Sequence, residues 1–116
     1  MYVVFLETPL PAVLLSGDGS TYGNVFVRGS DGNYGPVCDD DWGQEEAALV
    51  CRSLGFSGDN AVPTKNSRFG NVPKNLPMRY IKCNGTESQL QECDYDYYNC
   101  GEDSAAGVIC FPGMIY

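Results

Sequence analysis

The chain has 116 residues, 15 acidic against 7 basic side chains, a net charge of −8 and no histidine. The length fits a single domain, the lack of histidine excludes Ser-His-Asp and Cys-His catalysis, and the negative charge argues against nucleic-acid or anionic-lipid targets. An enzyme is therefore the weaker expectation.

The chain begins with an apolar stretch, MYVVFLETPLPAVLL, which Glu7, Pro9 and Pro11 interrupt. It lacks a basic n-region and a small-residue cleavage site, so it does not fit a signal peptide. No apolar run approaches the ~18 residues of a membrane-spanning helix, so no membrane insertion is expected. We expect residues 1–11 to be a linker or expression-derived segment, residues 12–112 one domain, and residues 113–116 a tail.

The next part of the chain predicts short strands. VLL (13–15) and NVFV (24–27) are rich in β-prone residues, and SGDGS and GSDGN supply turn residues after each of them. YGPVC (34–38) continues into a further strand.

The segment WGQEEAALVCRSLG (42–55) has the strongest helical pattern in the sequence and is predicted to form a helix. Two glutamates in its first turn and Arg52 near its end match the helix dipole, and Gly55 is a natural stop. One apolar stripe follows the i, i+3, i+4, i+7 spacing of a helix: Ala47, Val50, Cys51 and Leu54. Because Cys51 lies on this stripe, its disulfide would tie the helix to the core.

The second half of the chain alternates loops with short elements. Residues 57–77 are rich in Gly, Pro, Asn and Ser, which indicates a long loop, and MRYIKC (78–83) indicates a strand. In NGTESQLQEC, Thr86 and Gln89 fit a capping box that begins a second short helix. CDYDYYNC (93–100) is expected to be a loop and AAGVIC (105–110) a final buried strand. This order of elements predicts an α+β fold.

The chain has six cysteines: Cys38, Cys51, Cys83, Cys93, Cys100 and Cys110. An even number in a short chain indicates a disulfide framework made in an oxidising compartment, so an extracellular location is expected. Structural zinc sites usually contain ligand pairs two to four residues apart. At least six residues separate successive cysteines here, which favours disulfides over zinc.

Basic residues are concentrated in one window. No acidic residue occurs between Asn60 and Thr86, while five of the seven basic residues do. Either this is a solvated loop that happens to be basic, or it is a positive region that meets an anionic partner. In the second case we expect ligand contacts from Lys65, Arg68, Lys74 and Arg79.

Two further motifs are surface candidates. Tyr95, Tyr97 and Tyr98 alternate with aspartates, and tyrosine gives a large contact area at low entropy cost. We expect these rings to contact ligand, with the alternative that one or two of them cover the core. Asn84 begins an Asn-Gly-Thr sequon, which predicts a surface position for N-glycosylation.

Several blocks carry a family resemblance: GNVFV, YGPVCDDDW, AALVCRSLGF, RFGN, CNGTESQLQEC and NCGEDSAAGVIC. From about Val13 to Cys110 they resemble a scavenger receptor cysteine-rich domain of the six-cysteine, group A type. The resemblance implies a compact curved antiparallel sheet that cradles one main helix, with a short second helix. It also implies three disulfides: Cys38–Cys100, Cys51–Cys110 and Cys83–Cys93.

The resemblance also implies a function. Such domains are non-catalytic extracellular modules that bind polyanionic, microbial or protein ligands, often with Ca²⁺, in receptors and in innate immunity. We expect the isolated domain to be monomeric. Two alternatives are a regulatory or targeting module of a larger extracellular protease or oxidase, and a module that adheres through protein–protein contacts alone.

The resemblance places a possible Ca²⁺ site beside the first cysteine, at Asp39 and Asp40, with a further acid before the last cysteine. Ser104 and Ala105 occupy the positions of the family acids, but acids lie just upstream. The expected ligands are Asp39, Asp40, Asn99, Glu102 and Asp103. The alternative needs no cation, because acids that precede a helix are stabilised by its dipole, each by ~0.3–1 kcal/mol.

Overall fold

The computed structural model describes residues 11–16, 21–29, 32–73, 77–97 and 100–111, except the side chains of Gln91 and Tyr95. The elements are β1 (Val13–Leu15), β2 (Tyr22–Arg28), β3 (Tyr34–Pro36), α1 (Gln44–Ser53), β4 (Ser57–Thr64), β5 (Arg79–Lys82), the 3₁₀ turn η1 (Leu90–Glu92), β6 (Asp94–Tyr97) and β7 (Gly107–Phe111). The predicted residues 1–11 and 113–116 lie almost wholly outside the described ranges.

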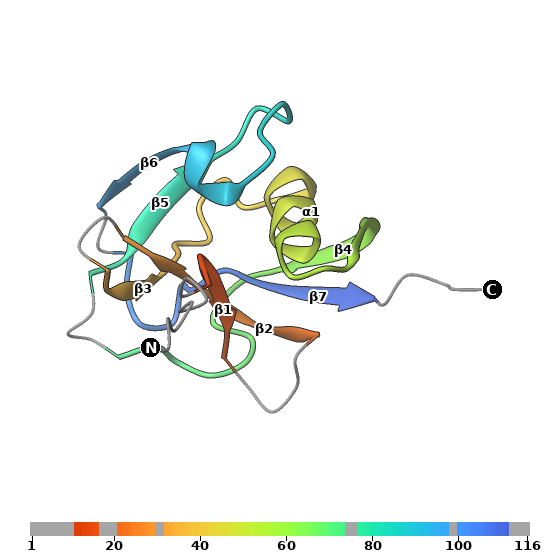
Figure 1. Cartoon of the computed structure of the whole chain (residues 1–116). Helices are drawn as coiled ribbons and strands as arrows, with labels where there is room; N and C mark the ends of the chain where they lie inside the picture. The colour runs from red at the N-terminus through yellow and green to blue at the C-terminus, as the bar shows by residue number, and fades with distance from the viewer. Residues whose placement is uncertain (1–10, 17–20, 30–31, 74–76, 98–99, 112–116) are drawn as a thin grey trace, which may run out of the picture.

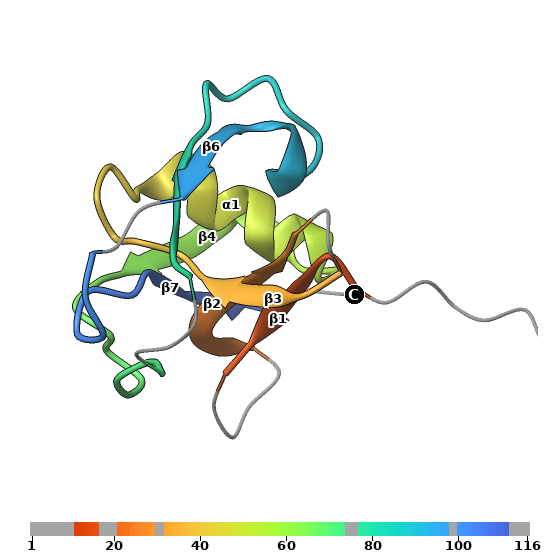
Figure 2. The ribbon, with the colours of Figure 1, turned by 90° about the vertical axis from the view of Figure 1, so that its left-hand side faces the viewer.

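Two antiparallel sheets make up the fold. The larger sheet has the order β1-β2-β7-β4, with β3 also paired to β2, and the smaller sheet consists of β5 and β6. α1 packs against β4, β7 and η1. Figures 1 and 2 both show α1, β5, β6 and η1 on the same side of the larger sheet. The predicted α+β class is confirmed.

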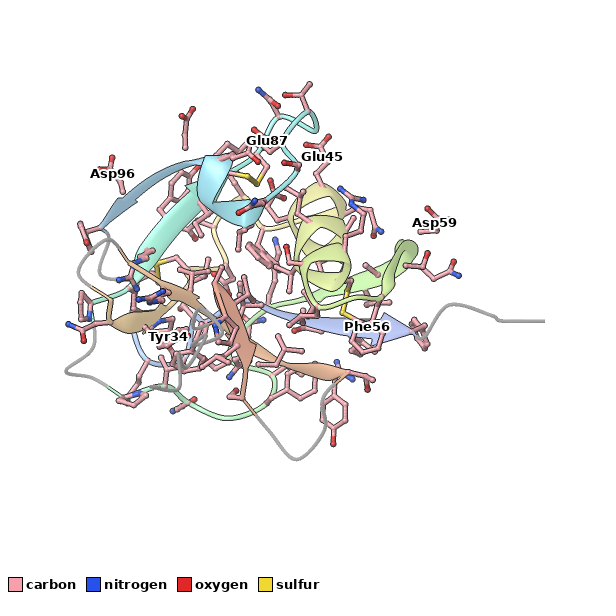
Figure 3. The ribbon with its side chains drawn as sticks, viewed as in Figure 1. Tyr34, Glu45, Phe56, Asp59, Glu87 and Asp96 are labelled. Atoms are coloured by element: carbon pink, nitrogen blue, oxygen red, sulfur yellow. A yellow bond between two sulfur atoms is a disulfide. The ribbon has the colours of Figure 1, made fainter. Side chains whose placement is uncertain are left out.

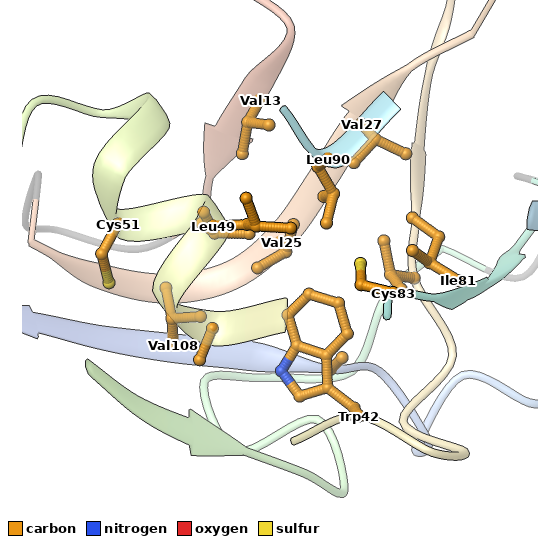
Figure 4. Packing of buried hydrophobic residues seen from close by; sticks show 14 of the residues in the cluster. Val13, Val25, Val27, Trp42, Leu49, Cys51, Ile81, Cys83, Leu90 and Val108 are labelled. Atoms are coloured by element: carbon orange, nitrogen blue, oxygen red, sulfur yellow. The ribbon is translucent and has the colours of Figure 1, made fainter. Parts of the chain in front are cut away.

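The main core cluster packs α1 against the larger sheet and contains Trp42, with Ile81 and Leu90 added from β5 and η1 (Figure 4). Trp42 is 2% exposed, and its indole Nε1 donates a 2.9 Å hydrogen bond to the carbonyl oxygen of Gly107. Val25, Leu49 and Val108 are buried in the same cluster. This hydrogen bond satisfies the one polar atom of the indole ring, which allows so large a side chain to be buried.

The predicted helix is confirmed, with Ala47, Val50 and Cys51 buried and Leu54 packed at the edge of the core. It ends at Ser53 with Leu54 as its C-cap, and the next residue, Gly55, has a φ of 91°, in the left-handed region that glycine adopts readily.

The helix also contains a buried charge that the apolar pattern does not predict. The carboxylate of Glu46 is 2% exposed and accepts the backbone N–H groups of Gly43 at 2.9 Å and of Cys83 at 3.0 Å. The first contact caps α1, and the second joins the helix to the end of β5.

The three disulfides join the cysteines in the pairing that the resemblance implies: Cys38–Cys100, Cys51–Cys110 and Cys83–Cys93. The second bond attaches α1 to β7, as the position of Cys51 on the apolar stripe predicted.

Two segments predicted to be loops are strands. Residues 57–64 form β4, an edge strand that pairs with β7 and contacts α1. Its Gly, Asn and Pro residues have low β propensity, but an edge strand tolerates Pro63 because one side of its backbone needs no partner. Residues 94–97 form β6, which pairs with β5 from Arg79↔Tyr97 to Lys82↔Asp94.

The prediction of a second short helix is wrong, because the structure has only the 3₁₀ turn η1 at this place. Thr86 does not cap a helix, because its backbone N–H and its hydroxyl both donate to Oδ1 of Asn84. The Glu92 carboxylate instead accepts the backbone N–H groups of Ser88 and Gln89. No helix in the described part of the chain is long and apolar enough to cross a membrane.

Candidate functional site

An open pocket of about 690 Å³ lies where the loops after β3 and β4 meet the β5–β6 ladder. Four carboxylates and one lysine line it, so their formal charges sum to −3 (−4 and +1). The lining residues are Asp39, Asp40, Asp41, Lys65, Asn66, Tyr80, Asp96 and Tyr97. We call this site the acidic pocket.

Backbone contacts hold the start of the Asp39–Asp41 triplet in place. Cys38 is buried, and its N–H donates to the carbonyl of Arg79 at 2.7 Å. The next N–H, that of Asp39, donates to the carbonyl of Ser104 at 2.9 Å. The triplet is therefore fixed between β5 and the segment that leads into β7.

One oxygen of the first carboxylate of the triplet, that of Asp39, accepts a hydrogen bond from the protein backbone. Oδ2 of Asp39 accepts the backbone N–H of Asn66 at 2.8 Å. Asn66 has a positive φ of 59° in the loop after β4. This bond links the triplet to that loop and brings Lys65 to the rim of the pocket.

The third carboxylate of the triplet is also engaged. Asp41 has a φ of 58°, a conformation that aspartate tolerates better than most residues, and its carboxylate accepts a hydrogen bond from the Tyr80 hydroxyl. That hydrogen bond to an anion is the main cause that raises the pKa of Tyr80 above its usual value, and the charge of Asp40 adds to the shift.

The side of the pocket formed by β6 is exposed. The register Tyr80↔Asp96 places an aspartate directly across the ladder from Tyr80. Tyr97 is 57% exposed, and its ring lies 5.5 Å from Cζ of Arg79. Asp40 and Asp96 are exposed as well, so the part of the pocket that faces solvent is acidic and aromatic.

The predicted Ca²⁺ ligands divide between two places. Asp39 and Asp40 line the acidic pocket, whereas Glu102 and Asp103 belong to a turn that is outside its lining. Asn99 lies outside the described residues. Ser104, which the resemblance places at the position of a family acid, is beside Asp39 through the hydrogen bond from the Asp39 N–H to its carbonyl.

The described residues contain one group of three metal-ligand side chains whose ligand atoms lie within 4.8 Å of one another, Cys83, Glu87 and Cys93. Its two cysteines form a disulfide, so it is not a metal site. The four described members of the predicted Ca²⁺ set do not come together at this spacing. Their oxygen donors suit Ca²⁺ in kind but are not assembled around one point.

The predicted basic ligand-binding set is divided as well. Lys65 and Arg68 are exposed, with Lys65 inside the acidic pocket, and Lys74 lies outside the described residues. Arg79, expected at the surface, is 2% exposed because Tyr97 covers it and its guanidinium lies over Gly35. The prediction of Arg79 as a ligand contact is therefore not supported.

Among the predicted tyrosines, Tyr97 lines the acidic pocket, whereas Tyr98 and the side chain of Tyr95 lie outside what the structure describes. Sequence reasoning missed four residues of the pocket as site residues: Asp41, Asn66, Tyr80 and Asp96. The alternation of aspartate and tyrosine in 94–97 has the period of a strand, so that signal could have indicated a strand here, but the register that sets Asp96 across from Tyr80 comes from the pairing with β5.

Comparison with known proteins assigns the fold to a family. Residues 15–111 match the profile of the scavenger receptor cysteine-rich (SRCR) domain, which covers most of the chain. The chain belongs to the SRCR family. It is a disulfide-rich, non-catalytic domain of a kind that is typical of extracellular proteins and generally binds protein or microbial ligands.

Individual relatives agree with this assignment. The chain is 33% identical over 100 residues to a scavenger receptor cysteine-rich domain superfamily protein of Patiria pectinifera, covering 84% of this chain and 9% of that protein. The third SRCR domain of murine neurotrypsin superposes with a TM-score of 0.72 at 33% identity, covering 84% of this chain and 94% of that one. The SRCR domain of mouse MARCO, in its dimeric form, gives 0.65 at 28% identity with the same coverages.

Proposed function

We propose that this SRCR domain binds a basic segment of an extracellular protein in the acidic pocket. The observation that carries the proposal is the convergence of Asp39–Asp41 with Asp96 and Tyr97 on one exposed pocket with a net charge of −3. A concave surface of one charge sign concentrates ligands of the opposite sign.

The chemistry of the pocket wall favours a lysine or arginine side chain. The exposed carboxylates of Asp40 and Asp96 can accept charge-assisted hydrogen bonds, which are the stronger kind. The Tyr97 ring adds an exposed aromatic surface beside them, and aromatic faces attract cations. A polyanion entering the same pocket without a metal ion would meet like charge.

Calcium assistance is a second candidate at the same place, favoured by the presence of Asp39 and Asp40 in the pocket wall. Carboxylate oxygens are the ligands that Ca²⁺ prefers, and a bound ion would attract acidic groups of a ligand. The two candidates therefore predict opposite ligand preferences in the presence of the ion.

The chain spans 9% of the length of the Patiria pectinifera relative. We propose that the domain likewise works as one module of a larger extracellular protein, as a receptor or adhesion module. A targeting module beside an enzyme is the alternative.

The proposal is tested by titrating the domain with hexaarginine and with hexaglutamate in chelator. We expect hexaarginine to bind and the double change Asp40→Asn/Asp96→Asn to weaken binding roughly 2- to 30-fold, because exposed ion pairs contribute about 0.2–1 kcal/mol each. The control pairs Asp59→Asn with Glu45→Gln, two exposed acids on β4 and α1 that Figure 3 shows well away from Asp96.

If the control pair weakened hexaarginine binding equally, the effect would come from the overall net charge of the domain and not from the acidic pocket. That result would contradict the proposal. Repeating the titrations with Ca²⁺ tests the second candidate. Hexaglutamate binding that appears only with Ca²⁺ and is lost in Asp39→Asn/Asp40→Asn would support it, and peptide binding that is indifferent to Ca²⁺ would remove it.

A further inference from the structure

The loop between β5 and η1 is a separate surface feature, away from the acidic pocket. The Cys83–Cys93 disulfide closes it, and Figures 1 and 2 show it projecting from the body of the domain. It contains Asn84-Gly85-Thr86, the one Asn-x-Ser/Thr sequence in the 116 residues. All three of these residues are exposed.

The hydrogen bonds of this loop leave one functional group of Asn84 available. Its Oδ1 accepts the backbone N–H of Thr86 at 2.9 Å and the Thr86 hydroxyl at 2.6 Å. Its backbone N–H donates to the carboxylate of Glu87. The amide nitrogen Nδ2 donates to no residue in the described part of the chain, so modifying it breaks no hydrogen bond within that part.

We propose that Asn84 carries an N-linked glycan. In the transfer, Nδ2 loses one proton and forms a bond to the anomeric carbon of an oligosaccharide activated as a lipid diphosphate, and the diphosphate leaves with the electron pair of the bond that breaks. The exposed side chain, the sequon and the oxidising compartment that three disulfides require together support this modification.

The position of Asn84 also determines what the glycan leaves uncovered. It lies four positions after Tyr80 and just beyond the end of β5, which at about 3.3 Å per residue is a separation of up to about 13 Å. Figure 3 shows Glu87, on the same loop as Asn84, well apart from Asp96 of the pocket. Gly85, the middle residue of the sequon, faces the side chain of Glu45, so the attachment point is on the α1 side of the domain. We therefore expect the glycan to leave the acidic pocket open.

The test is to secrete the domain from a eukaryotic cell and measure its intact mass before and after enzymatic release of N-glycans. We expect glycan mass on the wild type, conversion of Asn84 to aspartate on release, and retention of the glycan in Thr86→Ser. Asn84→Gln and Thr86→Ala should both lack it. A secreted wild type with the unmodified mass of the polypeptide would overturn the proposal, and this measurement requires no variant to fold.

A second measurement tests the placement, and it rests on the proposed function. The Kd of hexaarginine should agree within about twofold between the glycosylated and released forms, and any larger change would overturn the placement away from the pocket. If neither form binds hexaarginine, the proposed function fails. The mass measurement still shows independently whether Asn84 carries a glycan.

Discussion

The carboxylate of Asp39 accepts the backbone N–H of Asn66 at 2.8 Å, which joins the acidic triplet to the loop after β4. The neighbouring carboxylate of Asp40 makes no hydrogen bond to the described residues and is exposed. Two adjacent acids in the same pocket therefore have different roles, one positioned by the fold and one available to ligand.

This difference predicts different effects of two otherwise similar changes on folding. Asp39→Ala should lower the free energy of unfolding by about 0.5–1.5 kcal/mol, because a hydrogen bond to a backbone donor is lost. Asp40→Ala removes the same charge and should stay within about 0.5 kcal/mol of wild type. Urea denaturation of both variants checks this, and equal losses would show that Asp39 contributes through its charge alone.

Arg79 is a buried cation whose Nε and Nη1 have no hydrogen-bond partner among the described residues. Its stabilising contacts are the ring of Tyr97 and a long 3.5 Å hydrogen bond to the carbonyl of Asn33. Because burial of an incompletely paired charge is costly, Arg79→Met should leave the free energy of unfolding unchanged or raise it by about 1 kcal/mol.

Arg79→Ala is the matched control, because it removes the same charge and also creates a cavity. It should lower stability by about 2–5 kcal/mol, as other large-to-alanine core changes do. Chemical denaturation measures both variants. An equally large loss for Arg79→Met would contradict the view that the aliphatic part of the side chain, rather than its charge, stabilises the fold.

The three disulfides should differ in their contribution to stability. The Cys51–Cys110 bond spans 59 residues of sequence and the Cys83–Cys93 bond spans 10. If a disulfide stabilises by lowering the entropy of the unfolded chain, the Cys51–Cys110 bond should add about 1.6 kcal/mol more to the free energy of unfolding than the Cys83–Cys93 bond. Paired Cys→Ala variants, compared by thermal unfolding, check the order, and greater harm from losing Cys83–Cys93 would contradict it.

Glu87 gives the loop of the sequon a pH dependence. Its carboxylate accepts the backbone N–H groups of Asn84 and Gly85, and these contacts lower its pKa below the ordinary glutamate value. A depressed pKa in the folded state means stability that is present above the ordinary value and lost as the pH falls through the folded value.

The corresponding variant is Glu87→Gln. It should melt below the wild type at neutral pH, and the difference in Tm should shrink as the pH is lowered through and below the ordinary range of glutamate. Glu45→Gln, an exposed acid on α1, serves as control. A constant Tm difference at all pH values would rule out the charge of Glu87 as its source.

Local patterns predicted part of this structure well. The apolar stripe from Ala47 to Leu54 is a property of α1 alone, and the six cysteines carried the family pairing, so both could be predicted without coordinates. β4 and β6 could not be predicted from propensity, because their residues become strands through the partners β7 and β5.

The candidate site was predicted only in part for a related reason. Asp39 and Asp40 follow a recognisable cysteine motif, but Asp96 joins them only through the register Tyr80↔Asp96. Arg79 was misplaced because an arginine in a basic window is ordinarily exposed, and its burial depends on Tyr97, which follows 18 positions later and meets it only across the β5–β6 ladder.

A two-dimensional ¹H–¹⁵N NMR titration with hexaarginine in chelator shows directly whether a basic ligand enters the acidic pocket. The largest shifts should occur at the amides of Asp40, Asn66, Asp96 and Tyr97, while those of Asp59 and Glu45 should change little. Shifts that are spread evenly over the acidic surface, or that centre on β4 and α1, would contradict it.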